Sequence, residues 1–272
     1  MVNRREIEVS EGIIKLDDKS EINYYLAKPA DNGKYPAIII VHEIWGLEDN
    51  IKSIARRWAE EGYVAFAPHL FASIGPFMNS KNIESTMVKL WSLPREKMQD
   101  EKAIGTLMNT LNEDQKKVAS AVFFGRKDLG KNMIRNLDAC FDHVQKLDFV
   151  KSDMIGTTGF CFGGGLVFQY ATLGRSSATV VFYGANPDPI EAVSKIDRPI
   201  IAFYGGEDYN INQYIPRLME EIVRTKKSFH MKIYEGAQHA FFNDTRPTYN
   251  KDCADDAWEL AKEFFRKNLG GK

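Results

Sequence analysis

The chain has 272 residues, of which 44% are hydrophobic and 27% charged, and its formal net charge is -1. A chain of this length can bury about three-quarters of its unfolded surface, which predicts one domain over residues 1–272 with an elaboration. The balanced charge excludes a strong field for nucleic acid, and no apolar stretch reaches the roughly 18 residues of a membrane span. The start, MVNRREIEVSEG, lacks the apolar region of a signal peptide, so we expect a cytoplasmic protein.

Short apolar runs alternate with amphipathic segments, which predicts an α/β fold with a mostly parallel sheet and helices on both faces. Strands are expected at residues 22–27, 37–41, 64–67, 154–160, 178–183, 200–204 and 230–234. Apolar residues at helical spacing predict helices near residues 51–58, 134–144 and 254–265. The last of these helices is expected to pack on the sheet.

One segment interrupts this alternation. Residues 71–125 contain no convincing strand and carry many Met and Leu side chains, which predicts two or three inserted helices. An insert of this composition is more often a packed subdomain or a dimer contact than a pocket wall, although lids over active sites are also built this way. We therefore expect a monomer or a homodimer, with the role of the insert open.

The segment GFCFGGG, residues 159–165, follows a predicted strand and precedes good helix formers. Gly159-x-Cys161-x-Gly163 matches the nucleophile elbow G-x-S-x-G, with sulfur in place of oxygen. In that elbow a strand turns sharply into a helix, and glycines avoid collisions between neighbouring side chains. A helix start also favours the thiolate, which is the reactive form of cysteine. We predict that Cys161 is a nucleophile, although a cysteine is more often a small core residue.

In a fold of this kind the catalytic acid and then the histidine follow the nucleophile, each on a loop after a strand. The loop GGEDYN offers Glu207 and Asp208, and the later loop EGAQHAFFND offers His239. Of the five histidines, His239 is the one that follows a late strand and a glycine loop. We predict His239 as the general base and Asp208 as the carboxylate that orients it, with Glu207 the weaker candidate.

The sequence gives no reason to expect a metal or a cofactor. Cys140, Cys161 and Cys253 are far apart and lack the C-x-x-C spacing of a structural zinc site. The segment HEIWG begins like the zinc-protease motif H-E-x-x-H, but Gly46 stands where the second histidine would be.

Four segments together resemble the dienelactone hydrolases, which are α/β-hydrolases with a cysteine nucleophile. GFCFGGG, GGEDYN and EGAQHAFFND are similar to the elbow, acid loop and histidine loop of that family, and residues 41–71, beginning VHEIWGL, are similar to its early signature. The resemblance covers nearly the whole chain. It implies that Glu43 pairs with Cys161 in the resting enzyme and helps to form the thiolate when substrate enters. It also implies an oxyanion hole made by the backbone N–H groups of Ile44 and Phe162.

The chain departs from the family in its candidate substrate pocket. Family members that act on dienelactone bind the substrate carboxylate through arginines, one of them four residues after the catalytic histidine, where this chain has Asn243. Arg95 and Arg126 are candidate cations from the insert, and the aromatic rings of Trp45 and Phe162 are candidate apolar walls. We therefore expect a neutral ester or lactone to be preferred over a carboxylate-bearing one.

The sequence thus predicts a hydrolase that cleaves a small ester or lactone through an acyl-Cys161 thioester, with no nucleic-acid or membrane partner. A broader carboxylesterase or thioesterase on the same residues is the nearest alternative. A thiol redox protein and a catalytically silent ligand-binding relative are alternatives from other classes. Turnover of esters by the purified protein is required by the two hydrolase hypotheses and not by the redox or ligand-binding hypotheses.

Overall fold

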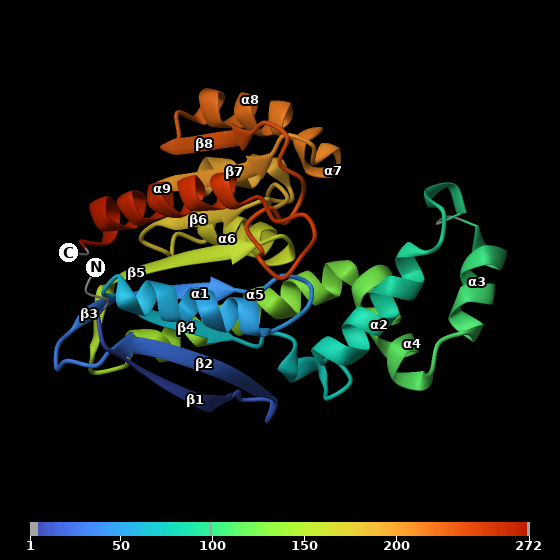
Figure 1. Cartoon of the computed structure of the whole chain (residues 1–272), viewed down its shortest axis with the longest axis horizontal. Coiled ribbons are helices and arrows are strands. Elements are labelled where there is room, and N and C mark those ends of the chain that lie inside the picture. The colour runs from blue at the N-terminus through green and yellow to red at the C-terminus, as the bar shows by residue number, and fades with distance from the viewer. Residues whose placement is uncertain (1–4, 98–99, 271–272) are drawn as a thin grey trace.

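The computed structural model describes residues 5–97 and 100–270 and contains one eight-stranded sheet with helices on both faces (Figure 1). The strands are β1 (Ile7–Lys15), β2 (Glu21–Pro29), β3 (Tyr35–Val41), β4 (Val64–Pro68), β5 (Val150–Phe160), β6 (Thr179–Phe182), β7 (Ile200–Gly205) and β8 (Phe229–Tyr234). Their order across the sheet is β1-β2-β4-β3-β5-β6-β7-β8. Strands β3 to β8 run parallel to one another, whereas β1 and β2 are antiparallel to their neighbours.

The central strands are continuous apolar runs because both of their faces are buried. Strand β3 reads YPAIIIV and β7 reads IIAFYG, and nearly all of their residues are inaccessible to solvent. The side chains of Ile39 and Val41 join the core on one face, and those of Ile38 and Ile40 join the core on the other. The seven predicted strands are present as β2 to β8, and β1 was not predicted.

Two helices cover one face of the sheet and three cover the other. Helices α1 (Asp49–Glu60) and α9 (Lys251–Leu269) lie over one core, where the rings of Trp58 and Trp258 are 4.2 Å apart. Helices α5 (Arg126–Gln145), α6 (Phe162–Ala171) and α8 (Ile215–Thr225) lie over the other. The expected helices correspond to α1, α5 and α9. The short α7 (Tyr209–Asn212), the 3-10 turn Ile190–Lys195 and α8 were not predicted.

Between β4 and α5 the chain forms the predicted helical insert. It contains α2 (Ser80–Trp91), α3 (Glu101–Asn109) and α4 (Glu113–Ala119), the 3-10 turns Ala72–Ile74 and Arg95–Lys97, and the π-helical turn Ser120–Phe124. Figure 1 shows these helices projecting from the end of the sheet toward which the arrow of β5 points. That end holds the carboxyl ends of the parallel strands, where α/β sheets carry their ligand sites.

Helices α2 and α4 pack together, whereas α3 contributes no buried residue. Gln115 of α4 donates to the Ser85 hydroxyl over 2.9 Å and accepts from Lys89 over 3.1 Å, and both partners lie on α2. Met78 and Met87 are buried in the same core that α5 and α6 cover. The base of the insert is therefore continuous with the core of the sheet. None of the helices in the described part of the chain is long and apolar enough to cross a membrane.

Candidate active site

Cys161 lies at the junction of β5 and α6 in a strained backbone conformation. Its φ of 54° and ψ of −115° fall in a region that side chains disfavour. The turn is fixed from both sides, because the Cys161 N–H donates to the Phe182 carbonyl over 3.0 Å and the Gly165 N–H donates to the Cys161 carbonyl over 3.1 Å. The thiol is partly exposed at the N-terminus of α6, where the helix dipole favours an anion.

The glycines beside Cys161 allow the chain to approach its neighbours closely. A Cβ atom on Gly159 would overlap the carbonyl of Gly163, and one on Gly163 would lie 2.5 Å from the carbonyl oxygen of Val41. The first turn of α6 therefore rests against the end of β3. This contact brings Cys161 next to the segment that begins at His42.

His239 and Asp208 form a hydrogen-bonded pair on the loops that follow β8 and β7. Nδ1 of His239 donates to Oδ2 of Asp208, which is only 4% exposed, whereas Glu207 points to solvent. The Glu207 N–H donates to the carbonyl of Ala237 over 2.9 Å, so the backbone holds the acid loop against the histidine loop. The structure thus joins Asp208, rather than Glu207, to the histidine.

The environment of His239 favours its charged form. Burial by itself lowers the pKa of this imidazole, but hydrogen bonds to Asp208 and Cys161 outweigh burial and raise the pKa to about 10. Because Nδ1 is bound to Asp208, Nε2 is the nitrogen that is available to the thiol. An imidazolium beside the sulfur can stabilise a thiolate once the thiol has lost its proton.

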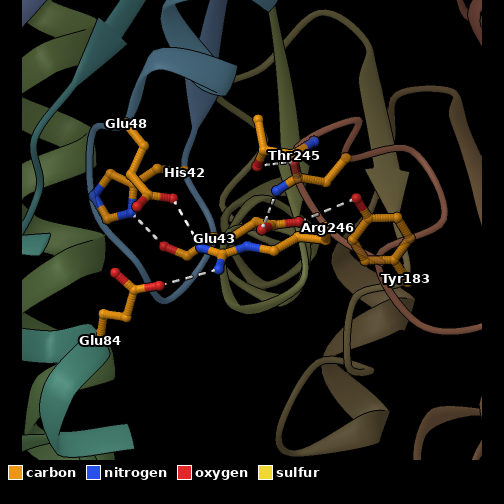
Figure 2. A network of polar contacts seen from close by, with 8 residues as sticks. His42, Glu43, Glu48, Glu84, Tyr183, Thr245 and Arg246 are labelled. Atoms are coloured by element: carbon orange, nitrogen blue, oxygen red, sulfur yellow. Dashed lines mark hydrogen bonds and ion pairs between the residues drawn. The ribbon is translucent and has the colours of Figure 1, made fainter. Parts of the chain in front are cut away.

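Glu43 is 3% exposed and is bound by two donors (Figure 2). The Tyr183 hydroxyl donates to Oε1 over 3.2 Å, and the Asn243 amide donates to Oε2 over 2.9 Å. Burial has the largest effect and raises the pKa of Glu43, while these two hydrogen bonds lower it in part. The Tyr183 ring lies 5.0 Å from that of His239, so Glu43 is separated from the histidine by a single side chain.

Asn243 is 1% exposed, and both ends of its amide are engaged. Its Oδ1 accepts from the Thr245 N–H over 3.0 Å and from the Thr245 hydroxyl over 2.7 Å. Because two donors occupy Oδ1, the amide nitrogen must face Glu43. In this structure Asn243 is therefore a partner of Glu43, rather than an exposed wall of a substrate pocket.

Arg246 is a cation near the site that sequence analysis missed. Its guanidinium binds Glu48 over 3.2 Å and Glu84 over 3.4 Å, and it lies 4.3 Å from the centre of the Trp45 ring. Its positive charge also lowers the pKa of Glu43. Figure 2 shows that Arg246 joins three segments: the histidine loop, the loop before α1, and helix α2 of the insert.

Two signals in the sequence could have indicated the missed residues. Arg246 lies two residues beyond the predicted histidine loop EGAQHAFFND, but sequence analysis compared only the position four residues after His239. Tyr183 directly follows β6, the strand beside the elbow strand β5. A tyrosine that ends a buried strand next to the nucleophile is a candidate donor for the site.

The other predicted site residues are placed as follows. Ile44 and Phe162 are partly buried, one just after β3 and the other at the first position of α6. Trp45 contacts Trp91 of α2 edge to face, with ring centres 5.3 Å apart.

Two predicted cations and the question of a metal site remain to be placed in the structure. The side chains of Arg95 and Arg126 lie outside the described residues, so their role as cations stays a prediction. Over residues 5–97 and 100–270, no group of three or more His, Cys, Asp or Glu side chains could hold a metal ion.

Comparison with known proteins identifies the family to which the chain belongs. A sequence model of the dienelactone hydrolase family matches residues 22–269. The chain belongs to the dienelactone hydrolase family. This membership confirms the predicted α/β-hydrolase fold and places the chain among hydrolases.

Relatives of this dienelactone hydrolase family member span nearly its whole length. A protein of Saccharolobus solfataricus, provisionally named carboxymethylenebutenolidase, is 44% identical over 92% of this chain and 95% of its own. A protein of Synechocystis with the same provisional name is 31% identical over 92% of this chain and 93% of its own. The crystal structure of a provisionally named dienelactone hydrolase from Klebsiella pneumoniae has a TM-score of 0.73 at 22% identity, and the match covers 97% of this chain and 100% of that one.

Proposed function

We propose that this protein hydrolyses an ester or lactone bond through an acyl-Cys161 intermediate, with His239 as the general base and then the general acid. The observation that carries this proposal is the geometry at Cys161. A cysteine on a strained, glycine-flanked turn lies close enough to a histidine to influence its charge, and the other nitrogen of that histidine is held by a buried aspartate. This is the arrangement of nucleophile, base and orienting acid that acyl transfer requires.

The proposed reaction has two halves. The Cys161 thiolate attacks the carbonyl carbon, and the carbonyl electrons move to an oxyanion bound by the N–H groups of Ile44 and Phe162. When the oxyanion collapses, the bond to the alcohol breaks and Nε2–H of His239 protonates the leaving oxygen. Water then attacks the thioester while His239 takes a proton from it, and the thiolate leaves as the carboxylic acid is released. The alcohol remains part of the same molecule when the substrate is a lactone.

We further propose that Glu43 pairs with Cys161 and accepts the proton of the thiol when substrate arrives, although in this structure its two oxygens are bound by Tyr183 and Asn243. Its burial and raised pKa support this role, because a carboxylate with a raised pKa accepts a proton more readily than an exposed one. Asp208, in contrast, is already bound to His239.

The substrate is a small ester or lactone, and the protein acts in the cytoplasm as a monomer or a homodimer. The provisional names of the two relatives make a lactone the first substrate to test. A neutral lactone remains the expected preference, because Asn243 provides no charge and the guanidinium of Arg246 already binds two carboxylates.

Turnover of an aryl acetate and of a lactone by the purified protein and four variants tests this function. Cys161→Ala is expected to abolish turnover, and His239→Ala to lower it about 100- to 10,000-fold. Asp208→Asn should cost less than His239→Ala, because an orienting group contributes less than the base it orients. Cys253→Ala is the matched control and should retain full activity. Wild-type turnover in His239→Ala, with the fold intact by circular dichroism, would show that another group is the base.

A further inference from the structure

His42 has a fully buried imidazole ring, and both of its nitrogens are hydrogen-bonded to backbone groups. Nδ1 lies 2.6 Å from the carbonyl oxygen of Glu43, and the Leu70 N–H lies 3.2 Å from Nε2. The same Glu43 oxygen also accepts from the Gly46 N–H over 3.3 Å. The ring therefore links the peptide that follows Glu43, a contact drawn in Figure 2, to the segment just after β4.

These partners leave a single tautomer for His42. A backbone N–H can only donate, so Nε2 must carry a lone pair to accept from Leu70. The proton must then sit on Nδ1, which donates to the Glu43 carbonyl. Burial, with a smaller contribution from His69, lowers the pKa of His42 to about 3. The neutral Nδ1–H form is therefore retained near neutral pH.

The hydrogen bond from His42 sets the direction of the next N–H group. The peptide between Glu43 and Ile44 is trans, since the cis bond in the described part of the chain is Asp188-Pro189. In a trans peptide the C=O and the N–H point in opposite directions. With the Glu43 carbonyl directed at His42, the Ile44 N–H points away from the ring.

The Ile44 N–H is available to a ligand. Within residues 5–97 and 100–270 it donates to no protein acceptor. The segment that carries it abuts the first turn of α6, because a Cβ on Gly163 would collide with the carbonyl of His42. No side chain caps that helix start at Phe162 either. A flip of the Glu43–Ile44 peptide would instead turn a carbonyl oxygen toward a site that must bind an oxyanion.

We propose that His42 is a positioning residue that fixes the Glu43–Ile44 peptide so that the Ile44 N–H stays directed into the oxyanion hole. This inference rests on the proposed function, since it explains how one of the two proposed donors is held. His42 does not touch the substrate and transfers no proton.

Two conservative variants separate the two hydrogen bonds of the ring. In His42→Asn the amide nitrogen falls near the place of Nδ1 and can still donate to the Glu43 carbonyl, whereas the bond to Leu70 is lost. In His42→Gln the longer side chain brings its amide near the place of Nε2, so it can serve Leu70 but not Glu43. We expect His42→Gln to lower kcat about 10- to 100-fold with little change in KM, and His42→Asn to restore most of that loss.

An inhibitor comparison distinguishes this role from general structural damage. A trifluoromethyl ketone adds to the thiolate and forms an oxyanion, whereas iodoacetamide alkylates the same sulfur without forming one. We expect His42→Gln to weaken trifluoromethyl ketone binding about 10- to 100-fold and to leave the rate of Cys161 alkylation unchanged. The matched control is His69→Leu, whose ring centre lies 5.7 Å from that of His42 but which does not bond to the peptide. His69→Leu should leave the ratio of trifluoromethyl ketone affinity to the rate of Cys161 alkylation unchanged.

The outcomes separate this inference from the function on which it rests. Wild-type protein that turns over no ester, or Cys161→Ala that keeps turnover, contradicts the proposed function. Normal wild-type turnover with equal losses in the Asn and Gln variants, or with inhibitor binding unchanged in both, overturns the role of His42.

The tautomer of His42 can be measured in the wild-type protein, so this test does not depend on the folding of a variant. Nitrogen-15 NMR of labelled histidines should show His42 as the neutral Nδ1–H tautomer from about pH 5 to about pH 9. An Nε2–H tautomer, or protonation within that range, overturns the proposal.

Discussion

Cys161 differs from the other two cysteines in backbone conformation, exposure and position. Cys140 is fully buried within α5, and burial raises the pKa of its thiol. Cys253 is half-buried in the first turn of α9, and burial again raises its pKa, followed by the charge of Asp252. Cys161 instead has a positive φ at the start of a helix, beside His239.

From this difference we expect iodoacetamide to alkylate Cys161 first, at least about tenfold faster than Cys140 or Cys253 near neutral pH. Peptide mass spectrometry at short reaction times measures the three rates in one sample. His239→Ala is the control and should slow alkylation at Cys161 alone. Equal rates at all three cysteines would rule out the elbow assignment.

Glu43 gives a prediction in which stability and activity change in opposite directions. Its pKa is raised in the folded protein by burial, so ionisation near neutral pH opposes folding. The stability linked to this group is complete below the unfolded pKa and is lost as pH rises through the folded value. Glu43→Gln should therefore be more stable than wild type at about pH 8, with a smaller difference at about pH 4.

The same variant should acylate more slowly, because an amide cannot accept the proton of the thiol. Urea unfolding at the two pH values and single-turnover acylation test both parts. Greater stability without any loss of acylation would leave Glu43 as a buried structural group. A loss of stability at the higher pH would contradict the assignment of a raised pKa.

The order of strands and loops in the sequence predicted the contact between Asp208 and His239, but it did not predict the partners of Glu43. Asp208 and His239 could be predicted because parallel strands end at the same edge of the sheet, which brings their loops together. The contacts of Tyr183 and Asn243 with Glu43 join residues 140 and 200 positions apart. Such contacts depend on side-chain directions that no local pattern encodes.

Among the elements, α2 of the insert has a direct connection to the site. Glu84 on α2 and Glu48 before α1 share the guanidinium of Arg246, which also lies over Trp45. The same helix carries Trp91, which packs edge to face on Trp45. The insert therefore borders the site through one helix, whichever of the roles expected for it proves correct.

This arrangement predicts a shift in specificity for Glu84→Gln. Removing one of the two carboxylates leaves Arg246 freer to attract a substrate carboxylate, at the cost of a half-exposed ion pair. We expect kcat/KM for a carboxylate-bearing lactone to rise about two- to fivefold relative to a neutral ester. Glu113→Gln, which removes the exposed ion pair with Lys116 on α4, is the matched control. It should change kcat/KM for neither substrate. An equal change for both substrates would contradict the assignment.

The elements that sequence analysis missed are those whose patterns are weak. Strand β1 reads IEVSEGIIK, and every residue in it is partly or fully exposed, because it forms an edge of the sheet with one neighbour. Helix α8 has only eleven residues, three of them buried, and Pro216 in its first turn resembles a loop signal. The central strands were found because burial on both faces requires continuous apolar runs.

For the whole molecule, the fold explains why residues from distant parts of the sequence form one site. The loops after β3, β5, β7 and β8 carry Glu43, Cys161, Asp208 and His239, and all four strands are parallel. Each loop therefore opens at the same edge of the sheet. The backbone hydrogen bonds of the sheet fix where these loops begin, which suits a reaction that depends on preorganised groups.

The central claim is that a substrate acyl group is carried on the sulfur of Cys161. Rapid acid quenching during turnover of an aryl acetate, followed by peptide mass spectrometry, measures this directly. We expect one acetyl group on the peptide that contains Cys161, appearing within the first turnover and disappearing when the ester is exhausted. The signal should be absent in Cys161→Ala. Sustained turnover with no acyl group on Cys161, or an acyl group on a different residue, would contradict the account.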